Sequence, residues 1–147
     1  RDGLVTGVQT CALPISAVAV NFIHHFFVSL FEESLFRGII LIKINKRMSA
    51  TLAIIVSSII FTLPHLINQP TRAELLSIFI GGLLLASMVI KSRSLGTAVG
   101  FHLMWNLLSI QMPNQSLWDF ISICVLLSTI CAIHIFYAFR NRSINID

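Results

Sequence analysis

Charged residues are scarce in this chain. Only 11% of its 147 residues are Asp, Glu, Lys or Arg, whereas 56% are hydrophobic and the mean hydropathy is +0.88. Soluble domains carry roughly 25% charged residues, so the composition excludes an ordinary soluble domain. Because the length is that of a single domain, the sequence predicts a one-domain membrane protein.

Cysteine is also rare, with only Cys11, Cys124 and Cys131 present. Their spacing matches neither a metal site nor a disulfide framework. The net charge of +4 comes from basic residues in short clusters between apolar runs, which is typical of membrane topology. We therefore expect the lipid bilayer as the partner of this chain, and no nucleic acid.

The stretch 1–16 resembles a translated sequencing adapter. Residues 5–15 correspond codon by codon to a common adapter, and Arg1-Asp2 fits the same primer. Segments of this kind are set aside before the fold is considered. We therefore interpret residues 17–147 as the native part, truncated at its N-terminus.

Apolar runs of helical length follow one another along the native part, separated by short polar or basic segments. A transmembrane helix needs about 20 predominantly apolar residues, and the shorter runs reach this length by including flanking residues. The sequence thus predicts an all-α fold, a multi-pass transmembrane helical bundle with about five apolar spans. The runs cover residues 17–44, 48–63, 75–90, 95–110 and 117–139.

The basic residues between the runs test this topology. If successive spans alternate in direction, one side of the membrane receives seven Lys and Arg residues and the other receives only Arg72. Basic residues are enriched in cytoplasmic loops, so the basic loops and the C-terminus are expected to be cytoplasmic. The seven residues are Lys43, Lys46, Arg47, Lys91, Arg93, Arg140 and Arg142.

Two adjacent carboxylates and an arginine interrupt the first apolar run, at Glu32, Glu33 and Arg37. An ionisable side chain at the bilayer centre costs roughly 2.5–3.5 kcal/mol, so such residues are usually functional. In a helix Glu33 and Arg37 share one face and can pair, whereas Glu32 points about 100° away and needs another partner. A buried ion pair that only fixes helix packing explains Glu33 and Arg37 but leaves Glu32 unexplained.

Two further polar sets lie in later apolar runs, each with i, i+4 spacing on one helix face. The first is Phe61 with His65, and the second is His102 with Asn106. A carboxylate, two imidazoles and an amide can supply a general base and donors for an oxyanion. A single buried histidine is more often a packing residue, but three polar sets on separate helices favour a catalytic site.

These sets, taken in order, resemble the motifs of the CPBP family, also named the Abi or CAAX protease family. Glu-Glu-x-x-Phe-Arg-Gly stands at 32–38, Phe-x-x-x-His at 61–65 and His-x-x-x-Asn at 102–106. The resemblance covers residues 26–108 and implies that 17–147 is a partial intramembrane protease domain. It implies an endopeptidase of a bacterial plasma membrane that acts on a peptide or membrane-protein substrate.

The resemblance also implies roles for individual residues. Glu32 and His65 would activate the attacking water, and His102 and Asn106 would stabilise the oxyanion. Supporting roles fall to Glu33, Arg37 and Phe61.

Metal dependence stays open at this point. Two histidines and a glutamate can ligate catalytic Zn²⁺, and the set here would be Glu32, His65 and His102. These residues lie on three helices instead of one compact metal-binding helix, so we favour glutamate-activated water with no obligatory cofactor. The alternatives of another class are a non-catalytic membrane scaffold or bacteriocin-immunity factor of the same fold, and a transporter with a proton-relay carboxylate.

The position of His65 along its helix poses a geometric problem. Straight helices at 1.5 Å per residue would place His65 about 10 Å from the level of Glu32 and His102. A tilt, a later helix start or a bend near Pro64 must close this distance if the three residues form one site. His24 and His25 precede Glu32 by about two turns, and one of them can face the same site, but packing or interfacial solvation is the favoured explanation for both.

Overall fold

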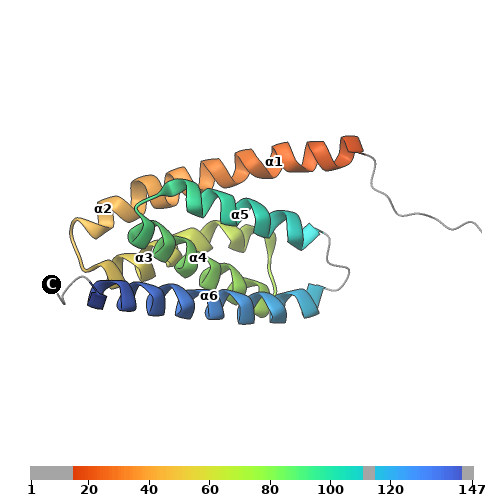
Figure 1. Cartoon of the computed structure of the whole chain (residues 1–147). Coiled ribbons are helices and arrows are strands. Elements are labelled where there is room, and N and C mark those ends of the chain that lie inside the picture. Colours follow the sequence, from red (N-terminus) through yellow and green to blue (C-terminus); the bar gives the residue numbers. More distant parts are fainter. Residues whose placement is uncertain (1–14, 111–114, 144–147) are drawn as a thin grey trace, which may run out of the picture.

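The structure, a computed structural model of the whole chain, describes residues 15–110 and 115–143. Most of the adapter-like stretch therefore lies outside the described residues. The described part contains only helices and no strand, which confirms the all-α prediction (Figure 1). The elements are α1 (Ile15–Glu33), the π-helical segment η1 (Ser34–Leu41), α2 (Ile42–Asn45), α3 (Ala50–Thr62), the 3₁₀ segment η2 (Leu63–Asn68), α4 (Arg72–Ser92), α5 (Leu95–Ile110) and α6 (Gln115–Ser143).

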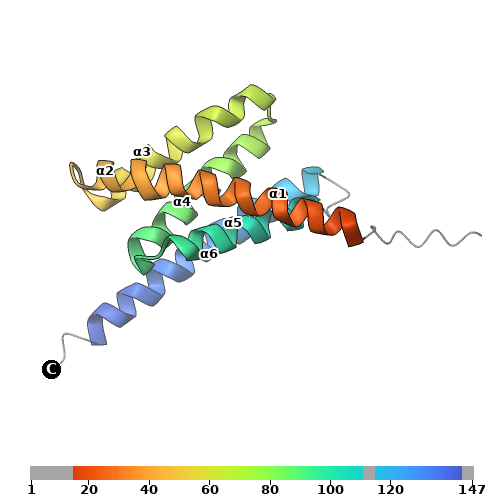
Figure 2. The same ribbon diagram turned by 90° about the horizontal axis from the view of Figure 1, so that it is seen from above.

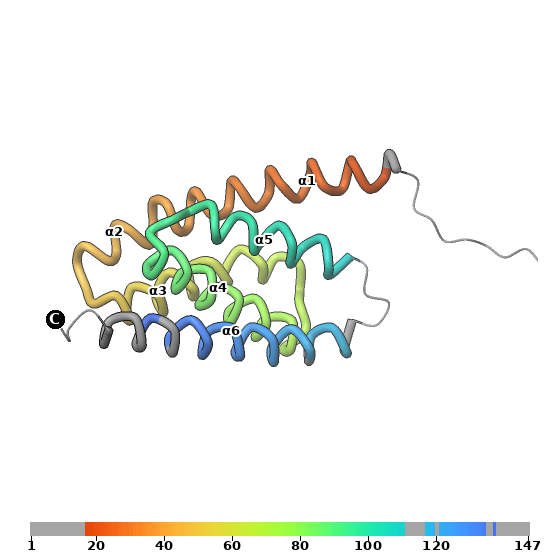
Figure 3. Tube along the Cα trace, in the orientation of Figure 1, coloured from red at the N-terminus to blue at the C-terminus, as the bar shows by residue number. Residues whose placement is uncertain are grey.

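Helix α4 lies at the centre of the bundle, in contact with α3, α5 and α6. Helix α1 packs along α5, and both views show the two helices side by side (Figures 1 and 2). The tube in Figure 3 shows α1 and α6 on opposite sides of the bundle. The core therefore forms where α4 meets the helices around it.

Three stretches within the described residues are long and apolar enough to cross a membrane: Ala50–Asn68, Arg72–Ser92 and Leu117–His134. Helix α5 is apolar but shorter, and α1 with η1 and α2 forms the first predicted run. Large apolar side chains such as Phe27 and Phe31 are exposed, as expected where lipid surrounds the helices. The chain is an integral membrane helical bundle.

Short polar motifs fix where α3 and α4 begin. The hydroxyl of Ser49 accepts a hydrogen bond from the amide of Leu52 at 3.4 Å. Thr71 and Glu74 form a reciprocal capping box at the start of α4. These caps satisfy amides that the first helical turn leaves without a partner.

The close packing of α3 against α4 depends on small residues. A Cβ atom on Gly82 would come within 3.2 Å of the Ser58 Cβ atom and 3.3 Å of the Phe61 Cδ1 atom. Small residues let membrane helices approach closely, so Gly82 allows α3, and Phe61 with it, to lie directly on α4.

Candidate active site

The two adjacent carboxylates, Glu32 and Glu33, lie at the end of α1, where the chain changes into the π-helical segment η1. π-Helical turns are rare and occur frequently at functional sites. Glu33 ends α1, and the guanidinium of Arg37, one turn later, donates a hydrogen bond to the Glu33 carboxylate at 3.0 Å. Both side chains are buried, at 0% and 1% exposure. The predicted i, i+4 pairing is therefore confirmed.

Arg37 also joins this pair to α3 and α4. Its second terminal nitrogen donates to the carbonyl oxygen of Gly82 at 3.4 Å. Its guanidinium carbon lies 4.1 Å from the centre of the Phe61 ring, a favourable cation–π arrangement. One buried cation thus links η1 to both neighbouring helices.

His102 of α5 lies between the two adjacent carboxylates. Its Nδ1–H donates to the Glu33 Oε1 atom at 2.9 Å, while Nε2 lies 3.7 Å from the Glu32 Oε2 atom. A carboxylate that accepts from one imidazole nitrogen fixes the orientation of the ring and of the other nitrogen. The partner that Glu32 was predicted to need is therefore His102, and the Glu32 side chain is 25% exposed.

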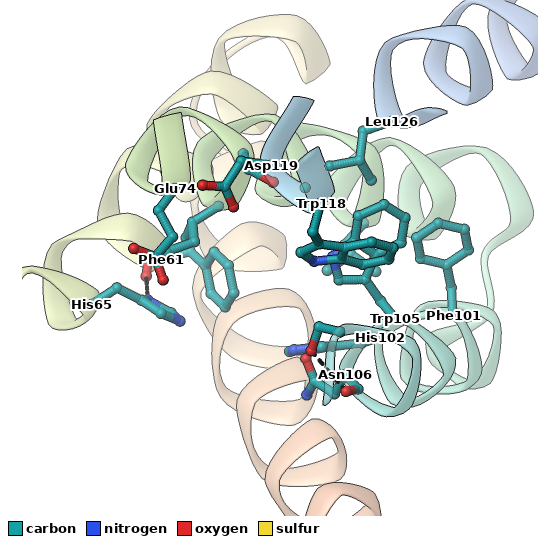
Figure 4. Close-up of a pocket in the computed structure, with 15 residues that line it drawn as sticks. Phe61, His65, Glu74, Phe101, His102, Trp105, Asn106, Trp118, Asp119 and Leu126 are labelled. Atoms are coloured by element: carbon teal, nitrogen blue, oxygen red, sulfur yellow. Dashed lines mark hydrogen bonds between the residues drawn. The ribbon is translucent and has the colours of Figure 1, made fainter. Parts of the chain in front are cut away.

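His65 lies in η2, on the side of the Phe61 ring that faces away from His102. Its Nδ1–H donates to the Phe61 carbonyl oxygen at 3.0 Å, since a carbonyl can only accept. In the neutral ring this leaves Nε2 as an acceptor. The Phe61 ring centre is 4.9 Å from that of His65 and 6.1 Å from that of His102. Figure 4 shows His65 and His102 on opposite sides of this aromatic ring.

The predicted distance problem is thus only partly resolved by the structure. Helix α3 begins at Ala50, later than the basic cluster that ends at Arg47, and the chain tightens into the 3₁₀ segment at Pro64. The later helix start brings His65 toward the level of the other groups, whereas the 3₁₀ segment, with a rise of about 2.0 Å per residue, does not. The Phe61 ring still separates His65 from His102.

A cavity of about 230 Å³ joins the two histidines. His65, His102 and Asn106 all line it, together with Phe61 (Figure 4). Glu32 is not among its lining residues and approaches the site from α1, through His102. The structure therefore brings three of the four predicted catalytic residues to one cavity and places the fourth next to it.

The sequence analysis assigned no site role to several other residues of this cavity. Trp105, Trp118, Asp119 and Glu74 also line it, and Asp119 is only 5% exposed. Trp118 and Asp119 lie at the start of α6, which follows α5 after a short connection. Their nearness in the sequence to the helix that carries His102 and Asn106 was the signal that could have indicated a place in the cavity. Gly82, which receives the Arg37 hydrogen bond, was also missed.

The arrangement of donor groups in the described part of the chain bears on the Zn²⁺ alternative. Within residues 15–110 and 115–143, no three His, Cys, Asp or Glu side chains lie close enough together to hold one metal ion. The conditional set of Glu32, His65 and His102 fails this criterion because Phe61 separates the two imidazoles. We therefore derive no chemical step through a metal.

Fold and site together define an integral membrane helical protein with paired carboxylates, imidazoles and an amide beside a partly open cavity. Residues 14–108 match the family described as type II CAAX prenyl endopeptidase Rce1-like. This match covers more than half of the chain, and the chain belongs to that family. The family resemblance derived from the motifs is confirmed, and with it a protease of the intramembrane endopeptidase type at the level of the family. No curated protein and no solved structure matches the chain.

Proposed function

We propose that this protein hydrolyses peptide bonds within the membrane, using Glu32, His65, His102 and Asn106 as its catalytic residues. The observation that carries the proposal is the placement of His102. Glu33 orients its ring, Glu32 lies 3.7 Å from its Nε2 atom, and its side chain opens on the cavity that His65 and Asn106 share.

In the proposed reaction Glu32 takes one proton from water, while the Nε2 atom of His65 accepts a hydrogen bond from the same water and orients it. The water oxygen then attacks the carbonyl carbon of the scissile peptide. The Asn106 amide and His102, in the form that carries a proton on Nε2 as well as on Nδ1, donate hydrogen bonds to the oxyanion that forms. Collapse of the tetrahedral intermediate breaks the C–N bond, and the proton taken from water passes to the leaving amine.

Glu33, Arg37 and Phe61 act as positioning residues in this proposal. Glu33 accepts from both Arg37 and His102, so it sets the orientation of the imidazole. Phe61 packs against Arg37, His65 and His102 and fixes the separation of the two histidines.

We further infer that the basic end of the bundle faces the cytoplasm of a bacterial cell. Figure 1 shows the turn between α2 and α3, the turn between α4 and α5 and the end of α6 at one end of the bundle, with the connection between α3 and α4 at the other. Lys46, Arg47 and Arg93 belong to the first end and Arg72 to the second, in agreement with the positive-inside rule. A peptide or a segment of a membrane protein is the proposed substrate.

The test compares peptide termini in membranes that express wild type, Glu32→Gln or a control variant at equal abundance. Loss of a general base lowers the rate roughly 10²–10⁴-fold, so termini produced by the wild type should disappear with Glu32→Gln. Asp147→Asn removes a carboxylate at the last residue of the sequence and should leave the termini unchanged.

Termini that persist with the inserted and folded Glu32→Gln variant would refute the catalytic proposal. A non-catalytic scaffold or bacteriocin-immunity role would then be the better explanation. Flux of protons or solute that depends on Glu32 would instead indicate a transporter.

A further inference from the structure

A row of polar side chains runs along α1 toward the site. His25, Ser29 and Glu33 are spaced at i, i+4 and i+8 and therefore share one face of the helix. Ser29 and Glu33 are fully buried, at 0% exposure. Helix α1 packs against α5, which carries His102 (Figures 1 and 2).

Each member of this row has a buried polar atom without a hydrogen-bond partner in the described part of the chain. The three atoms are the Nδ1 atom of His25, the Oγ atom of Ser29 and the Oε2 atom of Glu33. The other oxygen of Glu33 is already occupied by Arg37 and His102.

Three such atoms in one row indicate bound water. A buried polar atom without a partner costs about 1–3 kcal/mol, and the surrounding lipid cannot satisfy it. The Cβ atoms of residues at i and i+4 stand roughly 5–6 Å apart, and one water with two hydrogen bonds of about 2.8 Å can bridge polar atoms on neighbouring turns. Buried waters typically make about three hydrogen bonds to polar groups of this kind.

We propose that His25, Ser29 and the second oxygen of Glu33 form a hydration site, which holds water between α1 and α5 beside His102. His25 and Ser29 are positioning residues for water. That this water supplies the hydrolytic reaction rests on the proposed function, whereas the hydration site itself does not.

Radiolytic hydroxyl-radical footprinting tests the site directly, because the radical is generated from water and oxidises a thiol beside it. Ser29→Cys and Ser57→Cys are compared in the full chain, with Cys11, Cys124 and Cys131 replaced by alanine. Ser57 is a matched control because it is 2% exposed and its hydroxyl already donates to the Ile54 carbonyl at 3.2 Å. Thiols are the readily oxidised side chains, and we expect the thiol at position 29 to be oxidised roughly tenfold faster. Equal slow oxidation at both positions would overturn the proposal.

A second measurement covers the case in which a thiol disturbs the packing at position 29. Removing an unsatisfied hydroxyl from a dry interface stabilises a protein, whereas removing one that binds water does not. Ser29→Ala should therefore lower the unfolding temperature in detergent. A higher unfolding temperature for Ser29→Ala would mean a dry interface and would contradict the hydration site.

The peptide-termini experiment keeps the two proposals separate. If the thiol at position 29 is oxidised fast but the peptide termini do not depend on Glu32, the hydration site is supported and the protease proposal is refuted. If both proposals hold, Ser29→Ala should lower kcat with little change in KM, since water rather than substrate binding is affected, while Ser57→Ala leaves both unchanged.

Discussion

Glu32 and Glu33 are neighbours in the sequence but belong to two different regions of the molecule. Glu33 lies in a closed cluster with Arg37, and this cluster also holds the Gly82 carbonyl and the Phe61 ring. Glu32 lies at a more open position, with its Oε2 atom 3.7 Å from the Nε2 atom of His102. We define the first region as the ion-pair cluster and the second, with the cavity lined by His65, His102 and Asn106, as the cavity region.

The difference shows how a small membrane protein can hold charged groups for two purposes. In the ion-pair cluster every charge has a close partner, so the groups can stabilise the bundle. In the cavity region polar atoms face a partly open cavity, so they remain able to bind water or substrate. Mutations that separate stability from activity test this division.

Breaking the ion pair should have the largest effect on stability. Glu33→Ala leaves Arg37 buried without its partner, and a change of this kind costs about 3–5 kcal/mol. Unfolding of the purified protein in detergent measures the loss. The double variant Glu33→Leu with Arg37→Met removes both charges and should be closer to wild type than Glu33→Ala. A single variant as stable as wild type would show that the cluster does not stabilise the fold.

Separating α3 from α4 should have the next largest effect. A side chain at Gly82 meets Ser58 and Phe61, and overpacking of this kind costs roughly 1–3 kcal/mol. Gly82→Leu should therefore lower both stability and activity, because Phe61 and the Arg37 hydrogen bond are displaced. Gly100→Ala is the control, since nothing lies within 4 Å of a Cβ atom there. Equal stability of Gly82→Leu and wild type would refute the close-packing explanation.

Removing the hydroxyl contact between α4 and α6 should have a smaller effect. The Oγ atoms of Ser77 and Ser122 lie 2.6 Å apart, and interhelical hydrogen bonds in membranes contribute about 0.6 kcal/mol on average. A double-mutant cycle with Ser77→Ala and Ser122→Ala measures this coupling. A coupling near zero would mean that apolar packing alone, including Leu126, holds α6 against α4.

Glu32→Gln should have the smallest effect on stability. The Glu32 side chain is 25% exposed and its contact with His102 is long, at 3.7 Å, so the change should stay within about 0.5 kcal/mol. The same variant should abolish peptide cleavage. Loss of stability comparable to Glu33→Ala would place Glu32 in the ion-pair cluster and remove the distinction between the two regions.

The sequence by itself determined the features that depend on local spacing and composition. Low charge and apolar runs of helical length predicted the membrane bundle, and the motifs predicted the family, which the match over residues 14–108 confirms. The pairing of Glu33 with Arg37 followed from helical periodicity alone, because residues four apart meet on one face.

Only the tertiary structure decided what each local group meets. The contact of His102 with Glu33 joins residues 69 positions apart, and that of Arg37 with Gly82 joins residues 45 positions apart. Neither periodicity nor motif spacing specifies such pairs, because they depend on which helix faces which and at what height. The same reason explains why the sequence named Phe61 as a supporting residue without placing its ring between the two histidines, and why it did not predict the burial of Ser29 beside Glu33. Helix packing fixed both of these features.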